Sequence, residues 1–293
     1  MNWINLSLAS TGCFASAGML NKFIISNYAK DSNAYVVSQI LAQQIFIIPI
    51  LLVFGIKFAY PTSLYAILLG AFYVIPSIYY FKAMQVEDVS SVIALEYLYI
   101  VFVFLGAAVF LGEALTPRYY LGGAALVVSV LLLSFRYSGK GSLPKASPAI
   151  KQFYVYWIST ALYFLLLKYL LSTTGEWDIY TWTSVGNLIA ILPMLRDGGL
   201  RAEISSFFRN GAPAIGSLLG EECFHFTGTM FSMSAYALGS VSLVTLIGTL
   251  EPFMTMITVA MLSRFWPGVL QEEINLQKIA AIVCLLIGIY FIY

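Results

Sequence analysis

Long apolar segments separated by short polar connections repeat along the whole chain. Ten of these segments approach the length of about 20 residues that a helix needs to cross the hydrocarbon core of a bilayer. The pattern therefore predicts an all-α integral membrane protein with ten transmembrane helices. We expect these helices at residues 4–26, 34–54, 62–82, 89–111, 118–135, 149–171, 179–196, 211–233, 239–263 and 274–292.

Two connections are longer than the others. Residues 138–148, which are rich in glycine, serine and proline, have a linker-like composition and lie near the midpoint of the chain. The segment from Arg196 to Asn210 is polar and amphipathic, and we expect it to lie along the membrane surface. The linker divides the chain into a first unit, residues 1–137, and a second unit, residues 149–293, each with five predicted helices.

The two units show signs of an internal repeat. Residues 83–113 align without a gap with residues 235–265, and Lys22 near the end of the first predicted helix corresponds to Lys168 near the end of the sixth. Because five crossings are an odd number, the second unit would enter the membrane upside down. Inverted five-helix repeats are typical of secondary transporters, which bind their substrate near the bilayer midplane between the repeats.

The composition supports a membrane class and excludes several others. Apolar residues make up 60% of the chain and charged residues 10%, whereas soluble domains are roughly one-quarter charged. The net charge of +1 and the absence of a basic stretch with interleaved aromatics give no sign of a nucleic-acid partner. The three cysteines lie in apolar segments and have no zinc or disulfide spacing. The expected partners are the lipid bilayer and a small-molecule substrate.

Three ionisable residues, Glu221, Glu222 and His225, lie in the middle of an apolar segment. Charges at that depth are costly and usually mark a polar cavity, an ion path or a proton relay. His225 shares a helical face with either acid, but the two acids point about 100° apart. We expect one acid to face a cavity with His225 and the other to face a neighbouring helix. All three are candidates for proton coupling, and the alternative is a purely structural hydrogen-bond network.

The spacing Glu222-x-x-His225 resembles half of a dimetal carboxylate site, which needs a second Glu-x-x-His pair. The chain has one histidine, so the metal site is incomplete. The same histidine would have to serve a Ser–His–Asp triad, and the apolar segments offer no aspartate for it. We therefore expect no metal, no cofactor and no enzymatic activity.

Glu96 is followed by Tyr97 and Tyr99 within the fourth predicted helix. A carboxylate flanked by tyrosines could hold a cationic amine by charge and by cation–π contact. The alternative is that Glu96 only pairs with a lysine or with a tyrosine hydroxyl. Tyr99, Tyr73 and Tyr163, together with Glu222, are the further candidates for substrate binding.

Glu251 and Pro252 lie in the middle of the ninth predicted helix, where proline removes a helical hydrogen bond and introduces a kink. We interpret Glu251 as a residue with a structural role rather than a substrate-binding one. Lys22 and Lys168 lie near helix ends, where lysines usually extend to the membrane interface. The less favoured interpretation is that both lysines bind an anionic substrate.

Two motifs resemble the drug/metabolite transporter superfamily, specifically its ten-helix EamA-like branch. One is GAAVFLGEALT, from Gly106 to Thr116, and the other is TLEPF, from Thr249 to Phe253. The resemblance implies alternating access around a central cavity lined by helices 1, 3, 4, 6, 8 and 9. The second unit departs from the pattern, with Ser-Arg-Phe at residues 263–265 and an insertion at residues 266–275.

Acidic residues outnumber basic ones at the expected midplane. We therefore predict a secondary transporter for a small polar metabolite that is cationic or zwitterionic, such as an amine, a quaternary ammonium ion or an amino acid, with proton coupling. One alternative is an exchanger of anionic metabolites such as sugar phosphates, which would use Lys22 and Lys168. An alternative of another class is a non-transporting scaffold or lipid-handling subunit.

The basic residues predict an orientation in the membrane. Twelve of the 15 lysines and arginines fall on one predicted side. The positive-inside rule would then place both termini on the same, non-cytoplasmic side, whereas many relatives in the family it resembles are thought to keep both termini in the cytoplasm. The expected location is a bacterial cytoplasmic membrane. Stripes of small residues would serve helix packing or a homodimer face.

Overall fold

The computed structural model describes residues 2–87, 89–113, 116–136, 145–146, 149–265 and 276–292. The predicted linker, residues 138–148, lies outside this set except for residues 145–146, and the insertion at residues 266–275 lies outside it entirely. The described residues are almost entirely helical. A two-residue antiparallel pair joins β1 (Phe135–Arg136), before the predicted linker, to β2 (Lys145–Ala146), within it.

The helices lie where the apolar pattern predicts them, with ends that differ by a few residues. The first unit contains α1 (Trp3–Asn27), α2 (Ser32–Phe54), α3 (Thr62–Val86), α4 (Val89–Glu96), η1 (Tyr97–Tyr99), α5 (Ile100–Phe110) and α6 (Pro117–Ser134). The second unit contains α7 (Ile150–Leu171), α8 (Glu176–Ile191), η2 (Met194–Arg196), α9 (Gly198–Arg209), α10 (Ala212–Leu238), α11 (Val241–Gly248), α12 (Glu251–Phe265) and α13 (Leu276–Ile292).

Two predicted helices are interrupted in the middle. The fourth is divided into α4 and α5 by the tight turn η1, and the ninth is divided into α11 and α12 just before Glu251. In the register that aligns residues 83–113 with residues 235–265, the two interruptions fall at corresponding positions. Pro252 explains the second one, because it cannot donate a helical hydrogen bond.

The helix lengths and surfaces are those of an integral membrane protein. Five helical segments of the described chain are long and apolar enough to cross a bilayer: Ser32–Phe54, Thr62–Val86, Ser91–Phe110, Ile150–Leu171 and Val241–Val259. Two shorter apolar helices cover Pro117–Leu132 and Ile279–Phe291. Large apolar side chains face outward, among them Leu52, which is 81% exposed, and Phe110, which is 76% exposed. Such an apolar exterior is suited to lipid.

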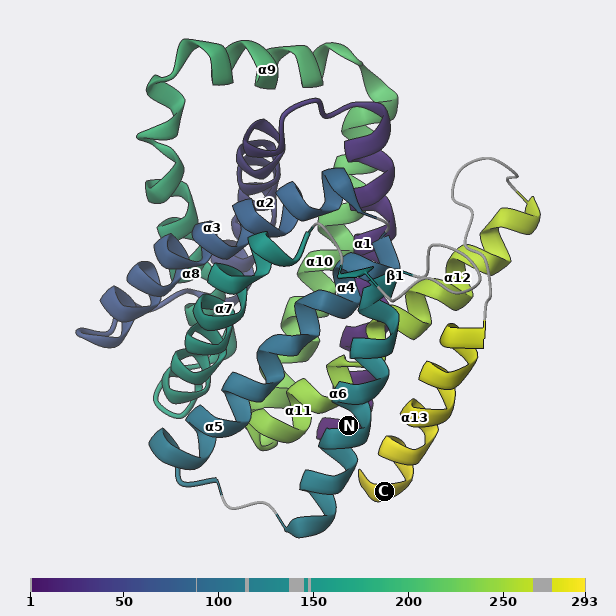
Figure 1. Ribbon diagram of the computed structural model, residues 1–293. Helices are drawn as coiled ribbons and strands as arrows, with labels where there is room; N and C mark the ends of the chain where they lie inside the picture. The colour runs from purple at the N-terminus through teal and green to yellow at the C-terminus, as the bar shows by residue number, and fades with distance from the viewer. Residues whose placement is uncertain are drawn as a thin grey trace.

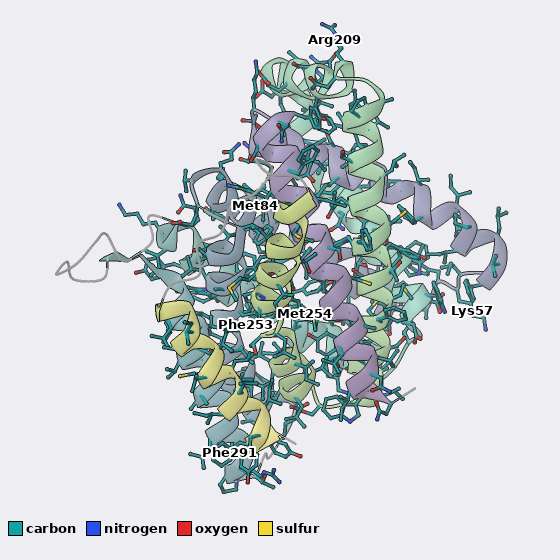
Figure 2. All side chains as sticks on the ribbon, turned by 90° about the vertical axis from the view of Figure 1, so that its right-hand side faces the viewer. Lys57, Met84, Arg209, Phe253, Met254 and Phe291 are labelled. Atoms are coloured by element: carbon teal, nitrogen blue, oxygen red, sulfur yellow. The ribbon has the colours of Figure 1, made fainter. Side chains whose placement is uncertain are left out.

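The two units are interleaved rather than separate. The first helix of each unit packs against the third long helix of the other, so that α1 lies along α10 and α7 lies along α3. The last helices, α6 and α13, lie side by side, and α9 runs across one end of the molecule (Figure 1). Arg209 at the end of α9 and Phe291 near the end of α13 lie at opposite extremes (Figure 2).

The backbones of the two units come close together at the crossing of α3 with α8. A Cβ atom placed on Gly70 would lie 1.9 Å from the carbonyl oxygen of Thr183, and one placed on Gly186 would lie 1.9 Å from that of Ile67. The two backbones therefore touch directly, which only glycine permits on both helices.

The connection after α8 contains the expected amphipathic helix, α9. Ile204 and Phe207 are buried, and the Phe207 ring lies 6.2 Å from the ring of Tyr35 on α2. Arg201 and Arg209 face outward. Thus α9 covers one end of α2 with its apolar side.

Candidate functional site

A central cavity of about 180 Å³ lies between the two units. It is lined by α1, α3, α4 with η1, α7, α10 and α12, which are the helices expected from the family resemblance, and also by α2 and α8.

The structure brings together all five residues predicted to bind substrate. They line the cavity together with His225 and are Glu96, Tyr99, Tyr73, Tyr163 and Glu222. The other predicted site residues, Glu221, Lys22 and Lys168, are not among the lining residues.

Glu96 faces the cavity from the end of α4, next to the turn η1. The hydroxyl of Tyr156 on α7 donates a hydrogen bond of 2.5 Å to Glu96 Oε1. The neighbouring Trp157 indole donates a hydrogen bond of 2.7 Å to the carbonyl oxygen of Leu95. These two bonds join α7 of the second unit to α4 of the first, and a hydrogen bond to a carboxylate is stronger than one between neutral groups.

Glu251 also lines the cavity, and its interpretation as more structural than substrate-binding stays a prediction. It begins α12 at the interruption of the ninth predicted helix, and the Tyr97 hydroxyl donates a hydrogen bond of 2.6 Å to its Oε2 atom. Glu96 and Glu251 are close enough for their charges to repel each other. The sequence contained a signal for the cavity-lining position of Glu251. In the repeat register Glu251 aligns with Tyr99, which was itself a candidate for substrate binding.

Aromatic rings from both units form much of the cavity wall. Tyr73 on α3 contacts Tyr163 on α7 with a centroid distance of 4.3 Å. Tyr99 stacks on Phe164 at 5.3 Å, and Tyr80 approaches Tyr156 at 6.1 Å. These ring faces can attract a cation by their quadrupoles.

Glu222 and His225 face the cavity from the same side of α10, as the three-residue spacing predicts. The His225 ring lies 5.7 Å from that of Phe14 on α1. Among the described residues, none hydrogen-bonds to either side chain. The described part of the chain also contains no group of three His, Cys, Asp or Glu residues that could hold a metal ion.

Glu221 does not line the cavity, and it faces neighbouring helices, as expected for the adjacent acid. It is fully buried and accepts hydrogen bonds from the Asn21 amide at 3.1 Å and the Gln39 amide at 2.9 Å. The Tyr35 hydroxyl in turn donates a hydrogen bond of 2.5 Å to Asn21 Oδ1. Glu221 thereby connects α10 to α1 and α2, and its role in proton coupling stays a prediction.

Lys22 binds the end of a neighbouring helix rather than extending only to the membrane interface. Its Nζ atom donates hydrogen bonds of 2.7 Å to the carbonyl oxygens of Met84 and Glu87, at the C-terminal end of α3. The last carbonyls of a helix lack partners within it and carry partial negative charge, so a cation there is stabilising.

Lys168 makes the equivalent interaction in the second unit. Its Nζ atom donates hydrogen bonds of 2.6 Å to the Tyr236 carbonyl and 2.8 Å to the Gly239 carbonyl, at the end of α10. In the repeat register these acceptors correspond to Met84 and Glu87. The sequence could not reveal either interaction, because each acceptor is more than 60 residues away from its lysine.

Glu113, in the LGE part of the first motif, binds the start of α11. Its carboxylate accepts hydrogen bonds from the backbone N–H and the hydroxyl of Ser242, at 3.3 and 2.8 Å. It also accepts bonds from the Val241 N–H at 2.8 Å and from the Ser240 hydroxyl at 2.7 Å. An acid at a helix N-terminus satisfies free N–H groups and complements the helix dipole.

Comparisons with known proteins agree with this fold. Residues 1–135 match the EamA-like transporter family, which confirms the resemblance found in the sequence. A protein with a solved crystal structure is similar over 97% of this chain and 97% of its own, with a TM-score of 0.63 and 14% identity. At that identity the similarity concerns the fold alone. No curated protein sequence matches the chain.

Proposed function

We propose that this protein, whose residues 1–135 match the EamA-like transporter family, is a secondary transporter of a small cationic or zwitterionic metabolite. The observation that carries this proposal is the charge of the central cavity. Glu96, Glu222 and Glu251 line it, and no lysine or arginine is present among its described lining residues. An anion would be repelled there, whereas an amine, a quaternary ammonium ion or an amino acid would find counter-charges and aromatic faces.

The proposed architecture is a ten-helix membrane protein of two inverted five-helix repeats, residues 1–137 and 149–293, joined by the linker at 138–148. Three observations support it: the family match ends at residue 135, the helix interruptions correspond, and Lys22 and Lys168 bind corresponding carbonyls. The charge distribution favours both termini on the non-cytoplasmic side of a bacterial cytoplasmic membrane.

In this proposal the substrate ammonium binds at Glu96, surrounded by Tyr73, Tyr99 and Tyr163. Glu222 takes part in substrate binding, and Glu221, Glu222 and His225 exchange a proton during the cycle. Access alternates between the two ends of the cavity while the site stays near the midplane. Each step needs only binding and proton exchange, so no cofactor is required.

The proposal can be tested with purified protein in lipid vesicles and a radiolabelled amine. We expect Glu96→Gln and Glu222→Gln each to reduce transport by about 30-fold or more, since losing a charged hydrogen-bond partner costs about 2 kcal/mol or more. Glu203→Gln on the surface helix α9 is the control and should transport normally. Wild-type rates in both cavity variants would contradict the site assignment.

Two further measurements separate the alternatives. An imposed pH gradient should change the rate of amine transport in the wild type and not in His225→Ala, if protons are exchanged at this site. Inhibition by sugar phosphates instead of amines would favour the anion-exchange alternative. The absence of transport for every class of solute would favour a scaffold or lipid-handling role.

A further inference from the structure

A second, smaller cavity of about 40 Å³ lies beside the central one, and we call it the hydroxyl pocket. It is bounded by α1, η1, α7, α10 and α11, and the wall that it shares with the central cavity includes Phe14, Tyr99 and Phe164. Eight of its twelve described lining residues carry a hydroxyl group, and none of the twelve carries a carboxylate or a side-chain nitrogen. The function proposed above makes no use of the serine and threonine residues of this pocket.

Four serine and threonine hydroxyls in this wall have already engaged their protons. Ser7, Thr11 and Thr245 each donate a hydrogen bond to the carbonyl oxygen four residues earlier in the same helix, at 2.8, 2.7 and 2.7 Å. Ser10 donates a hydrogen bond of 2.8 Å to the Gly228 carbonyl of α10. All four side chains are buried. Because each hydroxyl oxygen keeps lone-pair capacity, these groups can only accept a further bond.

Two tyrosine hydroxyls of the pocket are engaged in the same way. Tyr236 Oη lies 3.2 Å from Thr245 Oγ1, and because the Thr245 proton bonds the helix carbonyl, Tyr236 is the donor. Tyr97 donates a hydrogen bond of 2.6 Å to Glu251 Oε2. Six of the eight hydroxyls therefore offer lone pairs and no proton. A water molecule in the pocket would find few donors for its own oxygen, whereas a cation needs acceptors only.

Both helix interruptions reach this pocket. The turn η1 lines it from the first unit, and Gly248, the last residue of α11, lines it from the second. Pro252 has no N–H group and cannot donate to the Gly248 carbonyl, which is the bond that a continuous helix would make. The last carbonyls of a helix carry partial negative charge. A cation is therefore favoured at this position, within the apolar spans Ser91–Phe110 and Val241–Val259.

We propose that the hydroxyl pocket is a sodium site. Its candidate ligands are the hydroxyl oxygens of Ser10 and Thr245 and the carbonyl oxygen of Gly248. These are hard oxygen ligands without a full negative charge, which suits a monovalent cation, since divalent cations in proteins are bound mainly through carboxylates. Glu251 adds a nearby negative charge through its bond to Tyr97. The use of the ion to drive transport rests on the proposed function, whereas its binding does not.

The test measures the binding of ²²Na⁺ to the purified protein in nanodiscs. We expect saturable binding of one ion per chain, which unlabelled NaCl displaces and CaCl₂ at equal ionic strength does not. Thr245→Val and Ser10→Ala each remove one oxygen and should weaken binding at least about tenfold. Thr245→Ser keeps the oxygen and should bind the ion as the wild type does. Ser10→Ala also covers the case in which Thr245→Val does not fold.

Matched controls locate the ion. Thr258→Val on α12 and Ser16→Ala on α1 remove hydroxyls that make the same bonds to helix carbonyls outside both cavities, and neither should change binding. Glu222→Gln should also retain binding, because Glu222 lines the central cavity and not the hydroxyl pocket. The inference would be overturned by the absence of saturable binding, by unchanged binding in both Thr245→Val and Ser10→Ala, or by a loss in Glu222→Gln alone. A protein that binds the ion but transports no amine would contradict the proposed function and leave this inference standing.

Discussion

The crossing of α3 with α8 and the crossing of α10 with α2 are built from different kinds of residue. At the first, Gly70 and Gly186 let the two backbones touch. At the second, the buried Glu221 accepts a hydrogen bond from Gln39, and the rings of Phe46 and Phe226 stack at 5.0 Å. One pair of helices is held by backbone contact, and the other by side chains that include a charged group.

The repeat register makes this difference informative. Extended toward the N-terminus, it aligns Gly70 with Glu222 and Tyr73 with His225, so the same helical positions serve different purposes in the two units. In α3 this position is Gly70, which allows the backbone contact with α8. In α10 it is Glu222, whose carboxylate faces the cavity. If the two units are the proposed repeats, the ionisable pair Glu222 and His225 belongs to the second unit, and the aligned positions of the first unit are Gly70 and Tyr73.

The largest effect is expected from closing the glycine contact. In Gly186→Ala the new Cβ atom would overlap the Ile67 carbonyl, and helix backbones cannot move aside as side chains can. We expect a loss of more than about 3 kcal/mol in unfolding free energy, measured by thermal unfolding in detergent. Gly216→Ala, where a Cβ atom has open space, should be neutral or more stable by up to about 1 kcal/mol. Equal stability of the two variants would refute the backbone contact.

A smaller effect is expected at the second crossing. Glu221→Ala leaves the amide groups of Asn21 and Gln39 buried without their acceptor. We expect a loss of about 2 kcal/mol in the same unfolding measurement. Glu221→Gln preserves an acceptor and should lose less. Glu203→Ala on α9 provides the comparison for removing an acid from the surface, and a similar loss there would show that the network is not stabilising.

The smallest effect is expected from the two lysines, and it should be nearly equal in the two units. Lys22→Met and Lys168→Met each leave two helix-terminal carbonyls without their cation. We expect each variant to lose about 1 kcal/mol and to show faster hydrogen exchange in the last turn of α3 or α10, respectively. Lys151→Met, at an exposed position of α7, should change neither quantity. A loss of substrate binding without faster exchange would instead favour the anion-binding hypothesis.

Most of the helical framework could be predicted from the sequence. The length of an apolar segment determines where a helix can cross a bilayer. The helix predicted at residues 62–82 corresponds to Thr62–Val86, and the helix predicted at residues 211–233 corresponds to Ala212–Leu238. The interruption at η1 was missed, because Tyr97 and Tyr99 lack the chemical signature that Pro252 provides. Tyr97 in this interruption makes a tertiary contact, the hydrogen bond to Glu251, which local sequence cannot reveal.

The sequence could predict those features of the site that depend on the spacing of residues along one helix, because this spacing determines in which direction each side chain points. The divergence of Glu221 and Glu222 follows from helical geometry, and the structure agrees with it. The partners of these groups could not be predicted, because they come from distant segments. Tyr156 binds Glu96 across 60 residues, and the glycine contact of Gly70 depends on the path of a helix in the other unit.

Glu113 and Lys168 act on opposite sides of one corner, between α10 and α11. Lys168 binds the carbonyl end of α10, and Glu113, from the first unit, binds the amide end of α11. Two charged side chains therefore hold this corner, and Glu113 is the one that connects the end of α5 in the first unit to the second unit. In the repeat register, the position of Glu113 corresponds to Phe265, whose side chain cannot accept such bonds. The carboxylate of this corner therefore has no equivalent residue at the corresponding sequence position, and under the proposed transport function we expect the two half-cycles to run at different rates.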